Sequence, residues 1–124
     1  MVLGYIGFGE AAFEMSTGLR GEGLKDIVAF DNMIEHPVFG PQIKNRAGLS
    51  AVKLLPSAAE VIAASDLVMV AVPASVTLHT CETIAEYFRP GQLYVDLTAA
   101  SPAVKKAAAL LDKVSGMTNI MLMT

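Results

Sequence analysis

Short, continuous apolar segments alternate along this chain with segments whose apolar residues recur at helical spacing. The continuous segments predict six strands, at residues 2–6, 27–30, 52–55, 67–72, 93–97 and 119–123. The periodic segments predict helices at residues 10–20, 57–64, 75–88 and 101–113. An unbroken apolar run, such as the first segment, is typical of a strand that is buried on both faces. The alternation therefore predicts an α/β fold, with one doubly wound parallel sheet of about six strands and helices on both faces.

Local capping signals support two of these helices and leave one region open. Ser57-Ala58-Ala59-Glu60 matches a capping box, and Ser101-Pro102 places a hydroxyl before a proline at the first helical position. Residues 32–49 are harder to assign, because they contain the helix-breaking residues Pro37, Gly40, Pro41 and Gly48. A short helix over residues 42–47 and a loop are both compatible with this stretch.

Length and composition limit the class of protein. The chain has 124 residues, of which 53% are hydrophobic and 17% charged, and this balance excludes a disordered chain and indicates one domain. The longest charge-free run, residues 67–81, contains Pro73 and His79 and is too short to span a membrane. A net charge of −3 argues against a nucleic-acid partner, and a single cysteine, Cys81, excludes an intramolecular disulfide. With no basic N-terminal region of the signal-peptide type, we expect a cytoplasmic protein.

A glycine motif follows the first predicted strand. Gly7-Phe8-Gly9-Glu10-Ala11-Ala12 matches the pattern G-x-G-x-x-G/A and opens the first predicted helix. In that context Gly7 allows a tight turn, Gly9 lets the backbone approach a pyrophosphate, and Ala12 allows close packing of helix and strand. Free N–H groups at the helix start favour phosphate. The alternative is a tight strand–helix turn with no ligand.

Asp31 closes the second predicted strand, about 20 residues beyond the glycines. A carboxylate there accepts hydrogen bonds from the adenosine ribose hydroxyls of a dinucleotide. It repels a 2′-phosphate, and no Arg or Lys occurs at residues 32–35, so the pattern favours NAD over NADP. The alternative is a solvated aspartate in a turn.

Candidate residues also follow the fourth and fifth predicted strands. Val72 and Pro73 end the fourth strand, where the proline turns the chain across the switch point of the sheet or simply terminates the strand. Thr98 follows the fifth strand and could reach a nicotinamide or a substrate. Ser101 is better explained as a helix N-cap, and Asp96 as an acceptor for nearby backbone N–H groups.

No catalytic or metal-binding set emerges from the remaining polar residues. His79 and Cys81 lie two positions apart, which is not a helical spacing for metal ligands, so a packed or solvent-facing histidine and a buried cysteine are expected. Glu82 and Glu86 fit a solvated helix face. We assign neither a nucleophile with its base nor a metal ligand.

Together these segments resemble a known family. The chain is similar to the N-terminal NAD-binding domain of the β-hydroxyacid dehydrogenase superfamily, and most of all to the 6-phosphogluconate-dehydrogenase-like proteins. The resemblance rests on Leu3-Gly4-Tyr5-Ile6-Gly7-Phe8-Gly9, Val28-Ala29-Phe30-Asp31, Ala71-Val72-Pro73 and Val95-Asp96-Leu97-Thr98-Ala99-Ala100-Ser101-Pro102. It implies hydride transfer between a nicotinamide cofactor and a β-hydroxyacid. It also implies cofactor contacts at Gly7, Phe8, Gly9, Glu10, Ala11, Asp31, Asn32, Val72, Pro73 and Thr98.

Departures from the family pattern limit what the resemblance implies. Glu10 stands where many members have an apolar residue, and Ala99 where many have serine or threonine. The family's substrate-binding glycine motif, its catalytic lysine and its helical dimerisation domain have no counterpart in this sequence. We therefore expect residues 1–124 to form one dinucleotide-binding (Rossmann) domain that binds cofactor without turnover, and we assign no catalytic residue.

Two other interpretations remain open at this stage. One is a stand-alone NAD-binding regulatory or partner-binding module. The other is the cofactor domain of a pyrroline-carboxylate or prephenate-type reductase, which shares the glycine motif. Apolar surface near the last predicted helix and at residues 120–123 further predicts self-association into a homo-oligomer.

Overall fold

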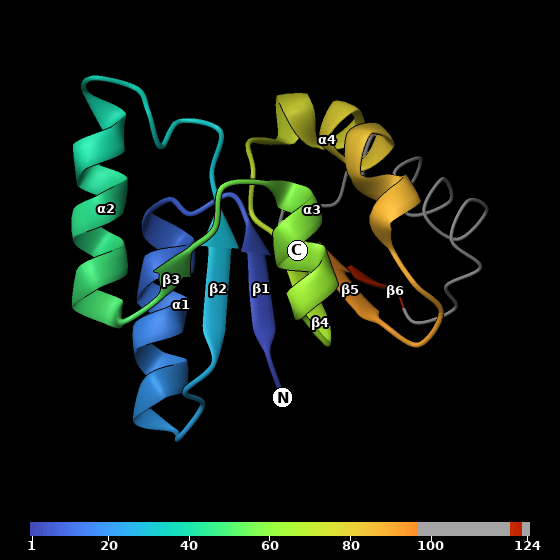
Figure 1. Ribbon diagram of the computed structural model, residues 1–124, viewed down its shortest axis with the longest axis horizontal. Helices are drawn as coiled ribbons and strands as arrows, with labels where there is room; N and C mark the ends of the chain where they lie inside the picture. Colours follow the sequence, from blue (N-terminus) through green and yellow to red (C-terminus); the bar gives the residue numbers. More distant parts are fainter. Residues whose placement is uncertain (97–119, 123–124) are drawn as a thin grey trace.

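The computed structural model describes residues 1–96 and 120–122 of the chain (Figure 1). Its strands are β1 (Leu3–Ile6), β2 (Ile27–Phe30), β3 (Lys53–Leu54), β4 (Leu67–Val70), β5 (Leu93–Asp96) and β6 (Ile120–Leu122). Its α-helices are α1 (Glu10–Gly21), α2 (Phe39–Ser50), α3 (Ala58–Ala64) and α4 (Thr77–Ile84). Two short 3₁₀ helices, η1 (Ala74–Val76) and η2 (Ala85–Tyr87), flank α4.

All six strands pair in parallel in one sheet of order β3-β2-β1-β4-β5-β6. The chain leaves β1 toward one edge of the sheet through β2 and β3, then returns to the other side of β1 for β4, β5 and β6. This is the predicted doubly wound α/β fold. Its switch point lies between β1 and β4, where such sheets bind ligands beyond their carboxyl ends.

Each face of the sheet carries its own apolar core, because side chains alternate between the two faces along each strand. Leu3 and Tyr5 of β1 pack on one face with residues of α1 and α2. Ile6 of β1 and Val70 of β4 pack on the other face with residues of α3 and α4. Burial on both faces explains why β1 is apolar throughout, and helices cover both faces as predicted (Figure 1).

The region that the sequence left open contains a full helix, α2, in place of a helix over residues 42–47 or a loop. Pro41 lies in the first turn of α2, where a missing N–H costs no helical hydrogen bond. Gly40 is buried, and a Cβ there would collide with the carbonyl oxygen of Ile34. Both helix-breaking residues thus occupy positions where the helix tolerates or requires them.

Boundaries differ elsewhere by a few residues. The Ser57 hydroxyl accepts the backbone N–H of Glu60 at 3.2 Å, which confirms the predicted N-cap of α3. β4 ends at Val70 rather than residue 72, and the helix predicted over residues 75–88 is divided into η1, α4 and η2. Tight 3₁₀ turns are common at helix ends. The helix predicted at residues 101–113 lies outside the described residues.

The described part of the chain contains no candidate membrane span. None of its helices is both long and apolar enough to cross a bilayer.

Candidate functional site

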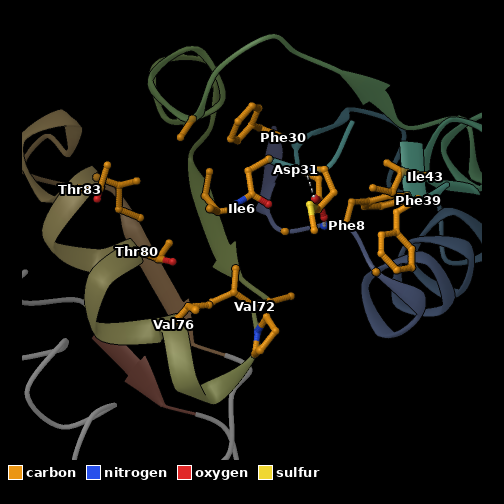
Figure 2. Close-up of a pocket in the computed structure, with 18 of the residues that line it drawn as sticks. Ile6, Phe8, Phe30, Asp31, Phe39, Ile43, Val72, Val76, Thr80 and Thr83 are labelled. Atoms are coloured by element: carbon orange, nitrogen blue, oxygen red, sulfur yellow. Dashed lines mark hydrogen bonds between the residues drawn. The ribbon is translucent and has the colours of Figure 1, made fainter. Parts of the chain in front are cut away.

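A cleft of about 600 Å³ opens at the carboxyl ends of β1, β2 and β4 (Figure 2). In the figure, Val76, Thr80 and Thr83 from η1 and α4 lie on one side, and Phe39 and Ile43 from α2 on the other. Ile6 and Asp31 lie between these walls. The cleft therefore occupies the switch point of the sheet, the position where doubly wound folds bind ligands.

Gly7 makes the turn from β1 toward α1 under constraints set by the fold. Its φ of +90° lies in the left-handed region that favours glycine. A Cβ at this position would also collide with the backbone carbonyl of Ala71, just beyond β4. The backbone N–H of Gly7 donates to the Phe30 carbonyl at 2.8 Å, which ties the turn to the end of β2.

Gly9 differs from Gly7, because nothing in the described part of the protein requires a glycine there. Its φ of −86° and ψ of −162° are extended values that any residue adopts. A Cβ at Gly9 would meet no described atom within 4 Å. Gly9 is also the N-cap of α1, and no described side chain caps this helix. An open backbone beside uncapped helical N–H groups is the arrangement that binds phosphate.

The carboxylate of Asp31 is fixed by two backbone N–H groups. Phe8 donates to its Oδ2 at 2.8 Å, and Met33 donates to its Oδ1 at 2.9 Å. Figure 2 shows the first of these hydrogen bonds as a dashed line at the centre of the cleft. Each oxygen of an ionised carboxylate has two acceptor positions, so both oxygens can still accept a ligand hydroxyl.

Phe8 anchors the turn through its ring and holds Asp31 through its backbone N–H. The ring is fully buried and packs edge-on against Tyr5, with 6.0 Å between the ring centroids. Because Phe8 as a whole is buried and its N–H is donated to Asp31, its role within the described structure is to fix the turn and the Asp31 carboxylate.

The structure brings most of the sequence-predicted site residues into this one cleft. Those that line it are Gly7, Phe8, Gly9, Asp31, Asn32, Val72 and Pro73. Glu10 and Ala11 are exposed in the first turn of α1, next to Gly9, and do not line the cleft. Thr98 and Ser101 lie outside the described residues, and for Asp96 only the strand is described.

One wall of the cleft was missed by the sequence analysis. Phe39, Gln42, Ile43 and Arg46 of α2 all line it. Their spacing of three, four and seven residues places them on one face of a helix. That spacing could have identified the wall, but Gly40, Pro41 and Gly48 concealed the helix that carries it.

The remaining candidates of the sequence analysis form no metal site. No group of three or more His, Cys, Asp or Glu side chains suited to a metal ion occurs among the residues that the structure describes. Cys81, on α4, is fully buried in the core, with its sulfur 3.1 Å from the Tyr94 hydroxyl. His79 is exposed on α4 at the cleft wall.

Sequence comparisons identify no family for this chain. It matches no known protein-family profile and no curated protein.

Solved structures do share its fold. One is a conserved hypothetical protein from Sinorhizobium meliloti 1021, with a TM-score of 0.82, 24% identity, and coverage of 98% of this chain and 40% of that chain. Another is Mycobacterium tuberculosis 3-hydroxyisobutyrate dehydrogenase with L-serine, with a TM-score of 0.76, 22% identity, and coverage of 98% and 39%. A third is prephenate dehydrogenase from A. aeolicus in complex with hydroxyphenyl propionate and NAD⁺, with a TM-score of 0.72, 18% identity, and coverage of 97% and 40%.

At these identities the likeness establishes the fold. The chain spans about two fifths of the length of these proteins.

Proposed function

We propose that this chain is the dinucleotide-binding domain of an NAD(P)-dependent oxidoreductase of the β-hydroxyacid dehydrogenase type. The observation that supports it most is the cleft at the switch point of the sheet, where the glycine turn and the Asp31 carboxylate meet. The similarity in fold to 3-hydroxyisobutyrate dehydrogenase and to an NAD⁺-containing prephenate dehydrogenase supports the same class. A bound nicotinamide dinucleotide supplies the hydride-transfer chemistry.

The geometry of the cleft fits the phosphate and ribose groups of such a cofactor. Gly9 leaves open space beside the uncapped start of α1, which suits a pyrophosphate. Asp31 retains acceptor positions for ribose hydroxyls, and its charge favours NAD over NADP. The cofactor contacts that we propose are Gly7, Phe8, Gly9, Glu10, Ala11, Asp31, Asn32, Val72, Pro73 and Thr98.

Catalysis requires more than this domain in our proposal. We assign no catalytic residue to residues 1–124, and we propose that a separate helical domain supplies the substrate site and the catalytic lysine. The chain alone then binds cofactor without turnover. We further propose that it works in the cytoplasm and self-associates through exposed apolar side chains.

A titration of the protein into NADH, followed by nicotinamide fluorescence, tests cofactor binding. We expect saturable binding by the wild-type chain and none detectable for Gly9→Val. The valine side chain would fill the space that the pyrophosphate needs, while the extended backbone and the empty surroundings of Gly9 let the variant fold.

Gly18→Val is the matched control for this experiment. Gly18 lies on α1 and does not line the cleft, and a Cβ added there would meet no described atom within 4 Å. We expect this variant to bind NADH as the wild type does. Absence of binding by the wild-type chain at millimolar NADH would contradict the proposed function, as would full binding by Gly9→Val.

The similarity to prephenate dehydrogenase supports a second candidate with the same cofactor chemistry. In that case the substrate is a prephenate-type acid rather than a β-hydroxyacid. Assay of both substrate classes with NAD, on protein that includes the complete reading frame, separates the two. A protein that binds NADH but turns over neither class favours a stand-alone regulatory module.

A further inference from the structure

Arg46 is the one Lys or Arg residue among the described residues that line the cleft. It lies on α2 one turn beyond Ile43, on the helix face that forms the wall opposite α4. The side chain is partly buried rather than extended into solvent. Arg46 follows Asp31 by fifteen positions in the sequence, yet both residues line the same cleft.

The guanidinium group of Arg46 has no protein partner in the described part of the chain. No ion pair within 4.0 Å and no hydrogen bond joins it to those residues. Asp31, the only described carboxylate that lines the cleft, instead accepts the N–H groups of Phe8 and Met33. A guanidinium that lines a cleft and has no partner among the described residues is available to bind a negatively charged ligand.

Phosphate is the ligand chemistry that suits this group. A guanidinium presents a planar fork of N–H donors that can bind two phosphate oxygens at once. The uncapped start of α1 suits the pyrophosphate, whereas Arg46 lines the cleft from a different helix, α2, and suits a second phosphate of the same ligand. In dinucleotide-binding folds, the group that extends from the adenosine ribose near this aspartate is the 2′-phosphate of NADP.

We propose that Arg46 binds the 2′-phosphate of NADP, so that the cleft accepts NADP as well as NAD. This inference rests on the proposed function. Residues 32–35, directly after Asp31, contain no Arg or Lys that could bind a 2′-phosphate. The fold supplies a cation from α2 instead. The two Asp31 hydrogen bonds reduce, without removing, the repulsion between its carboxylate and a 2′-phosphate.

Parallel titrations with NADH and NADPH test this role in the wild type and in Arg46→Gln. We expect the wild type to bind both cofactors, with NADH bound more tightly. Arg46→Gln should weaken NADPH binding about tenfold, since a hydrogen bond to a charged group contributes on that scale. Its NADH affinity should stay close to the wild-type value, because NADH carries no 2′-phosphate.

Lys44→Gln is the matched control, since it removes the same charge from the same helix. Lys44 is exposed and does not line the cleft. We expect its affinities for both cofactors to match the wild type at the same ionic strength. An equal loss of NADPH affinity in both variants would show that only the net charge of α2 matters, and it would overturn the proposal.

Other outcomes separate this inference from the proposed function. NADH binding without measurable NADPH binding in the wild type would overturn the role of Arg46 and leave the proposed function intact. An equal loss of NADH and NADPH affinity in Arg46→Gln would likewise overturn the role of Arg46 in binding the 2′-phosphate and leave the proposed function intact. If the wild type itself binds neither NADH nor NADPH, the proposed function is overturned.

Discussion

Gly7 and Gly9 lie two positions apart in one turn, and the described structure requires a glycine at only one of them. Gly7 combines a φ of +90° with a close approach to the Ala71 carbonyl, so the fold requires it. Gly9 has extended backbone angles and empty surroundings, so only a ligand would require it. The sequence motif names both residues, and only the structure separates the two roles.

Tyr5 allows a prediction about pH at the same scale. Its ring is fully buried in β1, and burial raises the pKa of its hydroxyl above 10.0, an effect that the Ser16 hydroxyl partly offsets. An unfolded chain therefore loses this proton at a lower pH than the folded chain. Stability from this group is fully present below the unfolded pKa and falls as the pH rises from there toward the folded pKa.

Thermal melts below and above pH 10.0 of the wild type and Tyr5→Phe measure this effect. The alkaline decrease in melting temperature should be smaller in Tyr5→Phe than in the wild type. Tyr87→Phe is the control, since Tyr87 is 41% exposed. The same alkaline decrease in all three proteins would show that the Tyr5 hydroxyl does not contribute to it.

At the scale of elements, α2 is the helix that local sequence predicted least well. Its first turn contains Gly40 and Pro41, which lower helix propensity but suit the close approach to Ile34 and the free N–H position. Its C-terminus is also unusual, because Ala51 adopts a left-handed φ of 54° where glycine is the common residue. Packing of Ile43 and Ala47 on the sheet therefore stabilises α2 against its own local preferences.

Ala51→Gly should stabilise the protein by about 0.5–1 kcal/mol, since glycine adopts the left-handed conformation without the steric cost of a Cβ. Ala51 is exposed, so little packing is lost. Denaturant unfolding monitored by circular dichroism measures the change.

The same substitution at Ala63 is the control and should have the opposite sign. Ala63 is exposed within α3, where glycine costs about 1 kcal/mol relative to alanine. Destabilisation by both substitutions to a similar extent would contradict the left-handed geometry of Ala51.

At the scale of the whole molecule, the cleft exists because three parallel strands end together between two packed layers. Gly7 N–H bonds to the Phe30 carbonyl and Ala71 N–H to the Ile6 carbonyl, each at 2.8 Å, which aligns the ends of β1, β2 and β4. Helices on opposite faces then supply the two walls. The site therefore belongs to the assembled sheet and its helices rather than to any one of the described elements.

Self-association is a prediction at this scale. Val38 is 59% exposed and Leu49 is 71% exposed, on α2 and the residue before it, and neither lines the cleft. Size-exclusion chromatography at increasing concentration should show a shift from monomer toward a larger species, and the shift should diminish in a Val38→Ser, Leu49→Ser double variant. The sequence predicted self-association through a different surface, near the last predicted helix and residues 120–123. The side chains of that surface lie outside the described part of the structure. Elution as a monomer at the highest concentration would contradict the proposed self-association.

Local chemistry in the sequence determined the order of strands and helices, the parallel sheet and the glycine turn. Continuous apolar runs identify strands buried on both faces, and Ser57 with Glu60 identifies a helix start, because these features depend on neighbours along the chain. The position of Asp31 directly after β2 could also be predicted, because it depends only on where the apolar run of β2 ends. Several candidate site residues could therefore be named in advance.

Contacts between distant segments decided the rest. The ring of Phe8 is buried against Tyr5, the carboxylate of Asp31 is held by the turn more than twenty residues earlier, and α2 places Arg46 in the cleft. None of these follows from local spacing, because each depends on how helices pack across the sheet. The sequence alone therefore predicted a dinucleotide site after β1 and β2, and the tertiary structure decided which charged side chains line the cleft there.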